Sequence, residues 1–226
     1  MRLVKQANCL QVLNLDVNDE RPQRHGDLLP DTVRGIICGP SNCGKTNVML
    51  TLLINENGLR FNNLYVYSKS LYQPKYLFLK NVMDLIPDMR YHAFNASEEV
   101  VSPDEVFENS VFIFDDVACE KQDNIRLYFC MGRHKAVDSF YLCQTYTRIP
   151  KHLVRDNSNF LILFKQDDMN LKHVYDDHVG TDMSFHEFKT ICAECWKDKY
   201  GFLVIDKDRD INKGRYKKNF EWYIYV

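Results

Sequence analysis

The chain has 226 residues and a formal net charge of −2, and 45% of its residues are hydrophobic. This length and composition predict a folded protein with a substantial core and exclude a disordered chain. The charge neither requires nor excludes a nucleic-acid partner, because a ring can concentrate basic side chains in its pore. No apolar run approaches the roughly 18 residues of a membrane span, and no signal-peptide pattern opens the chain. We therefore expect a soluble, intracellular protein.

The first 30 residues predict a lead-in made of one strand and a loop. Residues 10–17, LQVLNLDV, have the alternation of a strand, and residues 18–31 are polar and rich in turn formers. Within this loop, residues 24–27 are candidates to lie near a nucleotide base or a neighbouring subunit. A solvated loop is the interpretation that we favour for them.

The segment that follows carries the strongest motif of the sequence. Residues 36–38 predict a buried strand, and residues 46–54 contain neither Gly nor Pro, as expected of a helix. Between them lies the pattern G-x-x-x-x-G-K-[ST], which is typical of a loop that binds nucleotide phosphates. Its glycines let successive backbone N–H groups face an anion at the positive end of the helix. The predicted phosphate-binding residues are Gly39, Pro40, Ser41, Asn42, Cys43, Gly44, Lys45 and Thr46.

Two residues of this loop have further predicted roles. Lys45 would reach the β- and γ-phosphates of the nucleotide, and the Thr46 hydroxyl would ligate the Mg²⁺ ion that bridges them. The alternative is a glycine-rich turn that binds no ligand.

Strands and helices alternate after the loop, and residues 31–168 form the predicted core. The alternation is typical of an α/β fold with a mostly parallel sheet covered by helices on both faces. In such sheets ligands bind at the carboxyl ends of the strands. We expect strands at residues 63–70, 90–94, 111–114, 139–143 and 159–164, helices at about 76–86 and 125–131, and partial helix in the acidic residues 97–108.

Two strand ends carry polar residues that suit nucleotide hydrolysis. Asp115 follows an apolar strand, where a carboxylate can hold Mg²⁺ opposite Thr46. Asp116 is placed to polarise the attacking water. Gln144 ends the next strand, where a neutral amide can sense the γ-phosphate or orient water. The alternative for the two acidic residues is that they cap the helix that follows.

Gly132-Arg-His-Lys135 places cationic groups just before that strand. Arg133 has the chemistry to donate a bidentate fork to a γ-phosphate, and in a ring it would do so across a subunit boundary, as an arginine finger does. The alternative is a solvated basic turn.

Residues 169–226 predict a C-terminal elaboration packed on the core, with helices at about 170–177 and 184–196 and strands at 200–206 and 219–226. Cys192 and Cys195 have metal-like spacing, but a zinc site would need His178 or His186 as further ligands, so we favour two packed thiols. The most basic stretch either contacts DNA phosphates or forms a solvated hairpin turn. Its residues are Lys207, Arg209, Lys213, Arg215, Lys217 and Lys218.

Taken together, GPSNCGKT, VFIFDD, GRHKAVDSFYLCQ and IPKHLVRDNSNFLILFKQ closely resemble, in order and spacing, the poxvirus-type genome-packaging ATPases of the FtsK/HerA superfamily. That family occurs in large DNA viruses, virophages and Polinton or adintovirus-like elements, and the likeness runs from about residue 24 to residue 164. It implies an ASCE-type, RecA-like P-loop NTPase core that uses ATP and Mg²⁺. It also implies a ring, expected to be a hexamer, that drives double-stranded viral DNA into a preformed capsid at its portal vertex, in the nucleus or a cytoplasmic virus factory of the infected cell.

The resemblance also assigns roles to individual residues. Lys45 and Thr46 match the Walker A pair, Asp115 the Walker B carboxylate, and Gln144 the glutamine after the sensor strand. Arg133 resembles the trans-acting arginine, and Arg148 and Arg155 are rival candidates. One position departs from the family, because Asp116 stands where the catalytic glutamate is usual.

Three other classes compete with a DNA motor. A nucleoside or nucleotide kinase can begin with Gly-Pro-Ser-x-x-Gly-Lys, but it would be a monomer with an arginine-rich lid and no role for Gln144. A GTPase is disfavoured because Asn212-Lys213 lacks the Asp that recognises guanine. A scaffold that binds ATP without hydrolysing it would tolerate Asp116→Asn.

Overall fold

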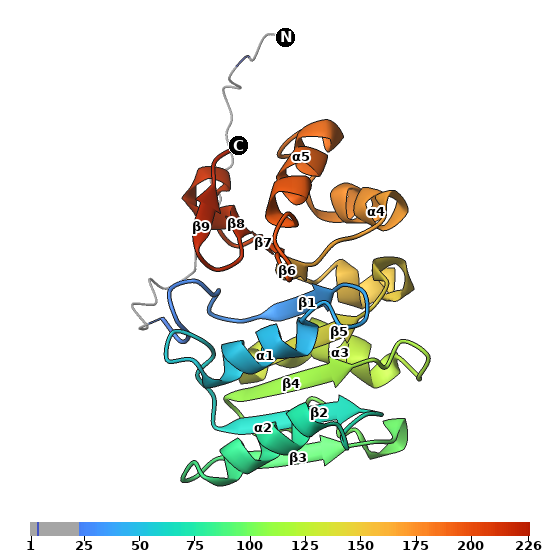
Figure 1. Ribbon diagram of the computed structural model, residues 1–226. Helices are drawn as coiled ribbons and strands as arrows, with labels where there is room; N and C mark the ends of the chain where they lie inside the picture. The colour runs from blue at the N-terminus through green and yellow to red at the C-terminus, as the bar shows by residue number, and fades with distance from the viewer. Residues whose placement is uncertain (1–3, 5–22) are drawn as a thin grey trace.

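A single sheet organises the computed structural model, which describes Val4 and residues 23–226. Nine strands of these residues pair in the order β3-β2-β4-β5-β1-β6-β7-β8-β9 (Figure 1). The strand predicted at residues 10–17 lies outside the described residues. The strands are β1 (Arg34–Cys38), β2 (Asn63–Ser68), β3 (Arg90–Phe94), β4 (Ser110–Asp115), β5 (Val137–Cys143), β6 (Phe160–Leu163), β7 (Leu203–Asp206), β8 (Tyr216–Lys218) and β9 (Trp222–Ile224).

The first six strands are parallel, and the last three continue the same sheet in antiparallel fashion. All residues of β1 except Arg34, and every residue of β2, β5 and β6, are buried, as expected of parallel strands covered on both faces. Strand β5 lies between β1 and β4, so the carboxyl ends of these three strands meet at one edge.

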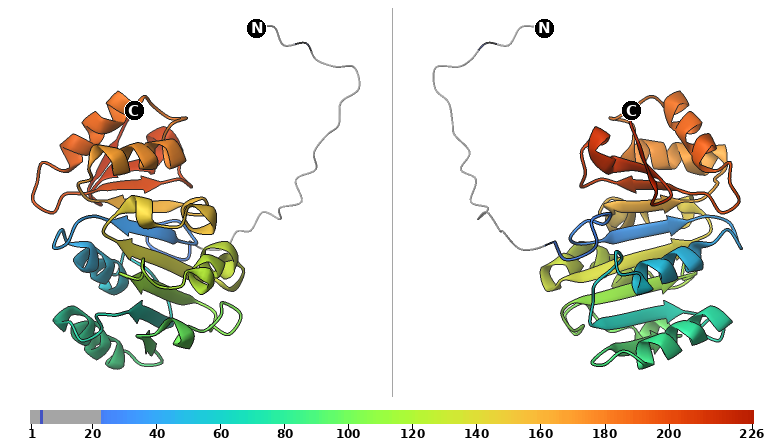
Figure 2. Two further views of the ribbon diagram at one scale, coloured as in Figure 1. Left: turned by 90° about the vertical axis from the view of Figure 1, so that its right-hand side faces the viewer. Right: turned by 60° about the vertical axis from the view of Figure 1, so that its left-hand side comes forward.

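Helices cover both faces of the sheet, as the sequence predicted (Figure 2). The first two pack on one face through Met49, Leu52, Leu79 and neighbouring apolar residues, and the other three pack on the opposite face. These helices are α1 (Lys45–Ile54) and α2 (Pro74–Asp84) on the first face, with α3 (Asp123–Met131), α4 (Asp168–His178) and α5 (Phe185–Cys195) on the second.

The C-terminal helices begin at sequence-encoded caps. The Asp167 carboxylate accepts a hydrogen bond from the backbone N–H of Asn170 at the start of α4. At the start of α5, Ser184 and Glu187 form a reciprocal capping box. Both arrangements satisfy N–H groups that have no partner within the helix. None of the described helices is long and apolar enough to cross a bilayer.

The acidic segment 97–108 is partly helical, as expected, through the single turn Ser97–Glu99. Two other local expectations differ from the structure. The final strand predicted at residues 219–226 is the shorter β9, because Asn219 has a left-handed φ of 53° that turns the chain. Residues 216–218, expected to belong to a basic turn, form β8. The division at residue 168 stays a prediction.

The described end of the lead-in, from residue 23 onward, is fixed to the amino end of β5. His25 and Asp138 are buried, and His25 Nε2 lies 3.0 Å from the Asp138 carboxylate. Arg24 pairs with the same carboxylate at 3.0 Å and donates to the Ala136 carbonyl. These residues therefore lie neither in a solvated loop nor beside the phosphate-binding loop, which is at the other end of the strands.

Candidate nucleotide-binding site

Residues 39–46 form the predicted loop between β1 and α1. The N–H of Gly39 donates to the Cys143 carbonyl at 3.1 Å, which fixes the loop to the end of β5. A Cβ on Gly39 would lie 2.5 Å from Cβ of Phe164, so a larger residue does not fit. Gly44 has φ of 112°, a conformation that L side chains rarely adopt. The loop thus needs glycine at both predicted positions.

Lys45 and Thr46 open α1, where the backbone N–H groups have no partner within the helix. The Lys45 ammonium donates to the carbonyls of Gly39 at 2.7 Å and Pro40 at 2.9 Å. Its charge is therefore held over the concave side of the loop. An anion there would meet both the ammonium and the positive end of the helix.

Asp115 ends β4 and is the most deeply placed carboxylate at this edge. The hydroxyl of Tyr76, from α2, donates to Asp115 Oδ2. Burial raises the pKa of the Asp115 carboxyl above its usual range, although the Tyr76 hydrogen bond and the Lys45 charge favour the ionised form. A bound cation would relieve this penalty, so the carboxylate fits a metal-ligand role.

Asp116 and Gln144 lie side by side at the ends of β4 and β5. Gln144 Nε2 lies 3.5 Å from Asp116 Oδ1. Asp116 has a left-handed φ of 55°, and its N–H donates to the Leu142 carbonyl. Asp is among the residues that tolerate this backbone conformation, which gives a physical reason for aspartate here. Because α3 begins only at Asp123, the helix-capping alternative for the acidic pair is wrong.

One cavity of about 200 Å³ gathers these residues. Three further polar residues that the sequence analysis did not single out also line it: Ser70, Gln73 and Lys75. They follow β2, whose polar tail at residues 68–70 was the available signal. The complete lining is Ser41, Asn42, Gly44, Lys45, Thr46, Ser70, Gln73, Lys75, Asp115, Asp116, Leu142, Cys143 and Gln144.

The three arginine candidates differ in their surroundings. Arg133 lies in the helical turn Gly132–Lys135, and its side chain is outside the described part of the structure. Arg148 is exposed. Arg155 is buried, donates to the Asp177 carboxylate at 2.7 Å and lies 5.1 Å from the centroid of the Tyr146 ring. Arg155 is therefore paired with Asp177 of the same chain through one nitrogen of its guanidinium, while its buried Nε makes no hydrogen bond within the described residues.

The zinc alternative finds no support among the described residues. Cys192 and Cys195 are buried thiols on α5, and burial raises the pKa of both. His186 is exposed, whereas His178 faces the Tyr146 hydroxyl at 2.7 Å. No cluster of three metal-ligating side chains occurs in the described residues. The packed-thiol interpretation fits this environment.

The basic C-terminal stretch is largely ion-paired. Five of its six cationic side chains have an acidic partner in the described structure, and the ammonium of Lys207 lies 3.3 Å from His178 Nδ1. The stretch offers less free positive charge than the sequence suggests. The pairs are Arg209–Asp206, Lys213–Asp210, Arg215–Asp182, Lys217–Asp206 and Lys218–Asp198.

The glycine loop, the acidic strand end and the additional strand β5 between β1 and β4 define a P-loop NTPase fold, as predicted. The chain resembles crystal structures of the genome packaging NTPase B204 from Sulfolobus turreted icosahedral virus 2. The sulfate complex has 13% identity and a TM-score of 0.56 and covers 78% of this chain and 92% of B204. The ATP-gammaS complex has 12% identity and a TM-score of 0.52 and covers 78% of this chain and 93% of B204.

The DNA-packaging ATPase B204 from Sulfolobus turreted icosahedral virus matches with 13% identity and a TM-score of 0.54, over 77% of this chain and 92% of that one. At such identities the similarity concerns the fold. No protein-family model and no curated protein sequence matches the chain.

Proposed function

We propose that this protein is a packaging ATPase that couples ATP hydrolysis to the movement of double-stranded DNA into a viral capsid. The observation that carries the proposal is the single cavity that contains Lys45, Thr46, Asp115, Asp116 and Gln144. The fold shared with B204 over nine-tenths of that packaging NTPase supports the same class. The motif resemblance adds the poxvirus-type family within the FtsK/HerA superfamily.

The residues of the site have distinct roles in this proposal. The loop N–H groups and Lys45 hold the phosphates, and Lys45 exchanges its bonds to the Gly39 and Pro40 carbonyls for phosphate oxygens. Thr46 and Asp115 supply oxygen ligands, which Mg²⁺ prefers, and the ion when bound would neutralise charge on the β- and γ-phosphates. Asp116 accepts a proton from the attacking water, and Gln144 orients that water.

The remaining parts of the proposal concern the assembly. Subunits form a ring, a hexamer in the simplest case, in which Arg133 of one subunit reaches the γ-phosphate bound by its neighbour and stabilises the charge of the transition state. DNA is contacted through its backbone without regard to sequence, because a motor must move along any sequence. The ring acts at the capsid or portal vertex inside the infected cell.

The test is ATP hydrolysis with and without long double-stranded DNA, with Lys45→Ala as the blank. We expect DNA to stimulate wild type and not the blank. Arg133→Ala subunits mixed into wild type should lower activity more than in proportion to their fraction, because each removes the finger of an adjacent site. Arg148→Ala mixed in the same way tests the rival finger, and Arg60→Ala, at an exposed arginine that is no finger candidate, is the matched control. Turnover that ignores DNA and rises with a nucleoside monophosphate would overturn the proposal in favour of a kinase.

A further inference from the structure

A turn that the phosphate-binding motif does not include approaches the loop from the C-terminal strands. Strand β7 runs antiparallel to β6, with Leu203 opposite Leu163, so it begins at the edge where β6 ends (Figure 1). The turn before β7 is therefore at the same edge as the phosphate-binding loop. Phe164, just after β6, lies between them: it packs against Gly39, and its ring centroid is 5.4 Å from that of Phe202.

Tyr200 is the residue of this turn that comes nearest to the loop. Its Cδ1 atom lies 3.8 Å from the position that a Cβ on Gly44 would occupy. The side chain is 56% exposed, and its hydroxyl makes no hydrogen bond within the described residues. The backbone has φ of 72°, an unfavourable conformation for an aromatic residue. The fold thus holds a largely exposed aromatic ring beside the phosphate-binding loop at a cost in backbone strain.

The turn is built to hold this conformation. The N–H of Gly201 donates to the Asp198 carbonyl at 3.0 Å. A Cβ on Gly201 would lie 2.2 Å from the Cys195 carbonyl oxygen, so only glycine allows the chain to return this closely to the end of α5. The ammonium of Lys199 lies 5.0 Å from the Tyr200 ring centroid, close enough for a cation–π contact.

A second cavity, of about 250 Å³, lies next to Tyr200 and along α1. Its walls include Val48 and Thr51 of α1 and the rings of Phe202 and Phe220. With a rise of about 1.5 Å per residue, Val48 and Thr51 lie about 3 and 7.5 Å beyond Thr46 along the helix axis. A ligand whose phosphates bind the N-terminal end of α1, and which extends along the side of the helix that faces Tyr200, would have its other end among these residues.

We infer that Tyr200 is the stacking platform for the purine base of the nucleotide. A base has a π-face that stacks on an aromatic ring, whereas inorganic phosphates have none. Val48 and Phe202 supply apolar surface for the same flat group. The inference rests on the proposed function, since it takes residues 39–46 as the triphosphate site. It adds a contact that lets the protein distinguish a nucleotide from inorganic phosphates.

The test compares the binding of ATP and of inorganic tripolyphosphate by calorimetry. Tyr200→Asn removes the ring, and Asn tolerates a positive φ, so this substitution preserves the turn. We expect it to weaken ATP binding roughly 10-fold and to leave tripolyphosphate binding unchanged. Tyr200→Phe should retain most of the affinity for ATP. Tyr225→Asn, at an exposed tyrosine near the C-terminus, is the matched control.

Two results would overturn the inference while leaving the phosphate site intact. One is an ATP affinity of Tyr200→Asn within twofold of wild type, and the other is an equal weakening of both ligands, which would mean a distorted loop. Lys45→Ala serves as the separate check on the phosphate site, because it should weaken both ligands. If wild type binds neither ligand, or if Lys45→Ala changes neither, the proposed function itself fails.

Discussion

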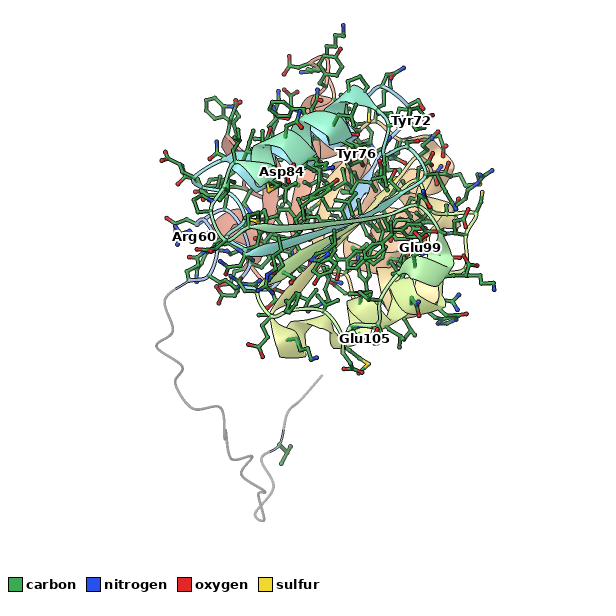
Figure 3. The ribbon with its side chains drawn as sticks, turned by 90° about the horizontal axis from the view of Figure 1, so that it is seen from below. Arg60, Tyr72, Tyr76, Asp84, Glu99 and Glu105 are labelled. Atoms are coloured by element: carbon green, nitrogen blue, oxygen red, sulfur yellow. The ribbon has the colours of Figure 1, made fainter. Side chains whose placement is uncertain are left out.

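The hydroxyl of Tyr76 donates a hydrogen bond to the carboxylate of Asp115, joining α2 to the acidic end of β4. Tyr76 is buried and lies on α2, the helix that also carries Asp84 (Figure 3). Burial is the largest cause that raises the pKa of Tyr76, so its proton stays in place at neutral pH. The pair thus fixes the orientation of the carboxylate that we assign to Mg²⁺.

Tyr76→Phe tests this positioning role. The substitution leaves Asp115 without its donor, so we expect a loss of about 1–2 kcal/mol in the free energy of unfolding at pH 7. ATP hydrolysis should fall about 10-fold, and the Mg²⁺ concentration for half-maximal activity should rise, because the carboxylate is less well oriented. Tyr72→Phe, at an exposed tyrosine just before α2, should change neither quantity. A Tyr76→Phe protein with unchanged Mg²⁺ dependence would contradict the positioning role.

Asp115→Asn separates stability from activity. Because the folded state raises the pKa of Asp115, keeping it ionised destabilises the fold at neutral pH without a bound cation. The isosteric amide still accepts from Tyr76, so we expect a Tm a few degrees higher, since about 1 kcal/mol corresponds to roughly 2–4 °C at this chain length. Hydrolysis should be lost, because an amide is a poor Mg²⁺ ligand.

The pH dependence of this effect has a definite sign. Above the raised folded-state pKa of Asp115, the ionised carboxylate destabilises the fold by its full amount. This destabilisation decreases as the pH drops through that pKa towards the lower pKa that Asp115 has in the unfolded chain. The Tm difference between wild type and Asp115→Asn, measured without nucleotide or divalent cation, should therefore shrink on acidification. Asp116→Asn is the control, because its side chain is exposed. It should lower hydrolysis about 10²-fold or more without raising Tm. An Asp116→Asn protein with full activity would point to a different base.

Much of the site follows from short segments of sequence. Residues 39–46 form a contiguous motif, and Asp115 and Gln144 each follow a run of strand formers, so the parallel order alone brings them to one edge. Tyr76 could not be placed in this way. Its bond to Asp115 spans 39 positions and depends on how α2 crosses between β2 and β3. The same holds for Lys75, which reaches the cavity from the same helix.

For the basic C-terminal stretch, the sequence indicates a feature that the structure mostly removes. Its sequence indicates exposed positive charge, but Lys217 is buried against Asp206, and Arg215 pairs with Asp182 from the turn between α4 and α5. The amino-acid composition of the stretch shows how many cationic side chains it has, but not which of them pair with acidic side chains elsewhere in the chain. Tertiary packing alone decides which of these cations face solvent.

Arg155 and Arg148 should behave differently when replaced. Arg155→Ala leaves the buried Asp177 carboxylate without its main partner, so we expect about 3 kcal/mol or more of destabilisation. Arg148→Ala should stay within about 0.5 kcal/mol of wild type, as exposed substitutions usually do. Urea unfolding measures both. If Arg155→Ala kept its stability yet inhibited wild-type subunits in mixed assemblies, Arg155 would be the trans-acting finger after all.

His178 predicts an acid sensitivity that is independent of the nucleotide site. The pKa of His178 is lowered to about 3, and burial is the main cause. The nearby charges of Lys207, Arg155 and Arg215 contribute in the same direction. The ring stays neutral in the folded state but gains a proton on unfolding below about pH 6.5. Stability is therefore lost as pH falls from 6.5 towards 3, by about 2 kcal/mol between pH 6.5 and pH 5.

Urea unfolding of wild type and His178→Gln at pH 7.5 and pH 5 tests this assignment. Other groups titrate over the same range, so the informative quantity is the difference between the two proteins at each pH. We expect His178→Gln to be less stable at pH 7.5, because it disturbs the contact with the Tyr146 hydroxyl, and to lose about 2 kcal/mol less than wild type on acidification. His186→Gln, at an exposed histidine of α5, should follow wild type at both pH values. Equal acid losses in wild type and His178→Gln would mean that His178 is already protonated in the folded protein, contrary to its buried position beside the Lys207 ammonium.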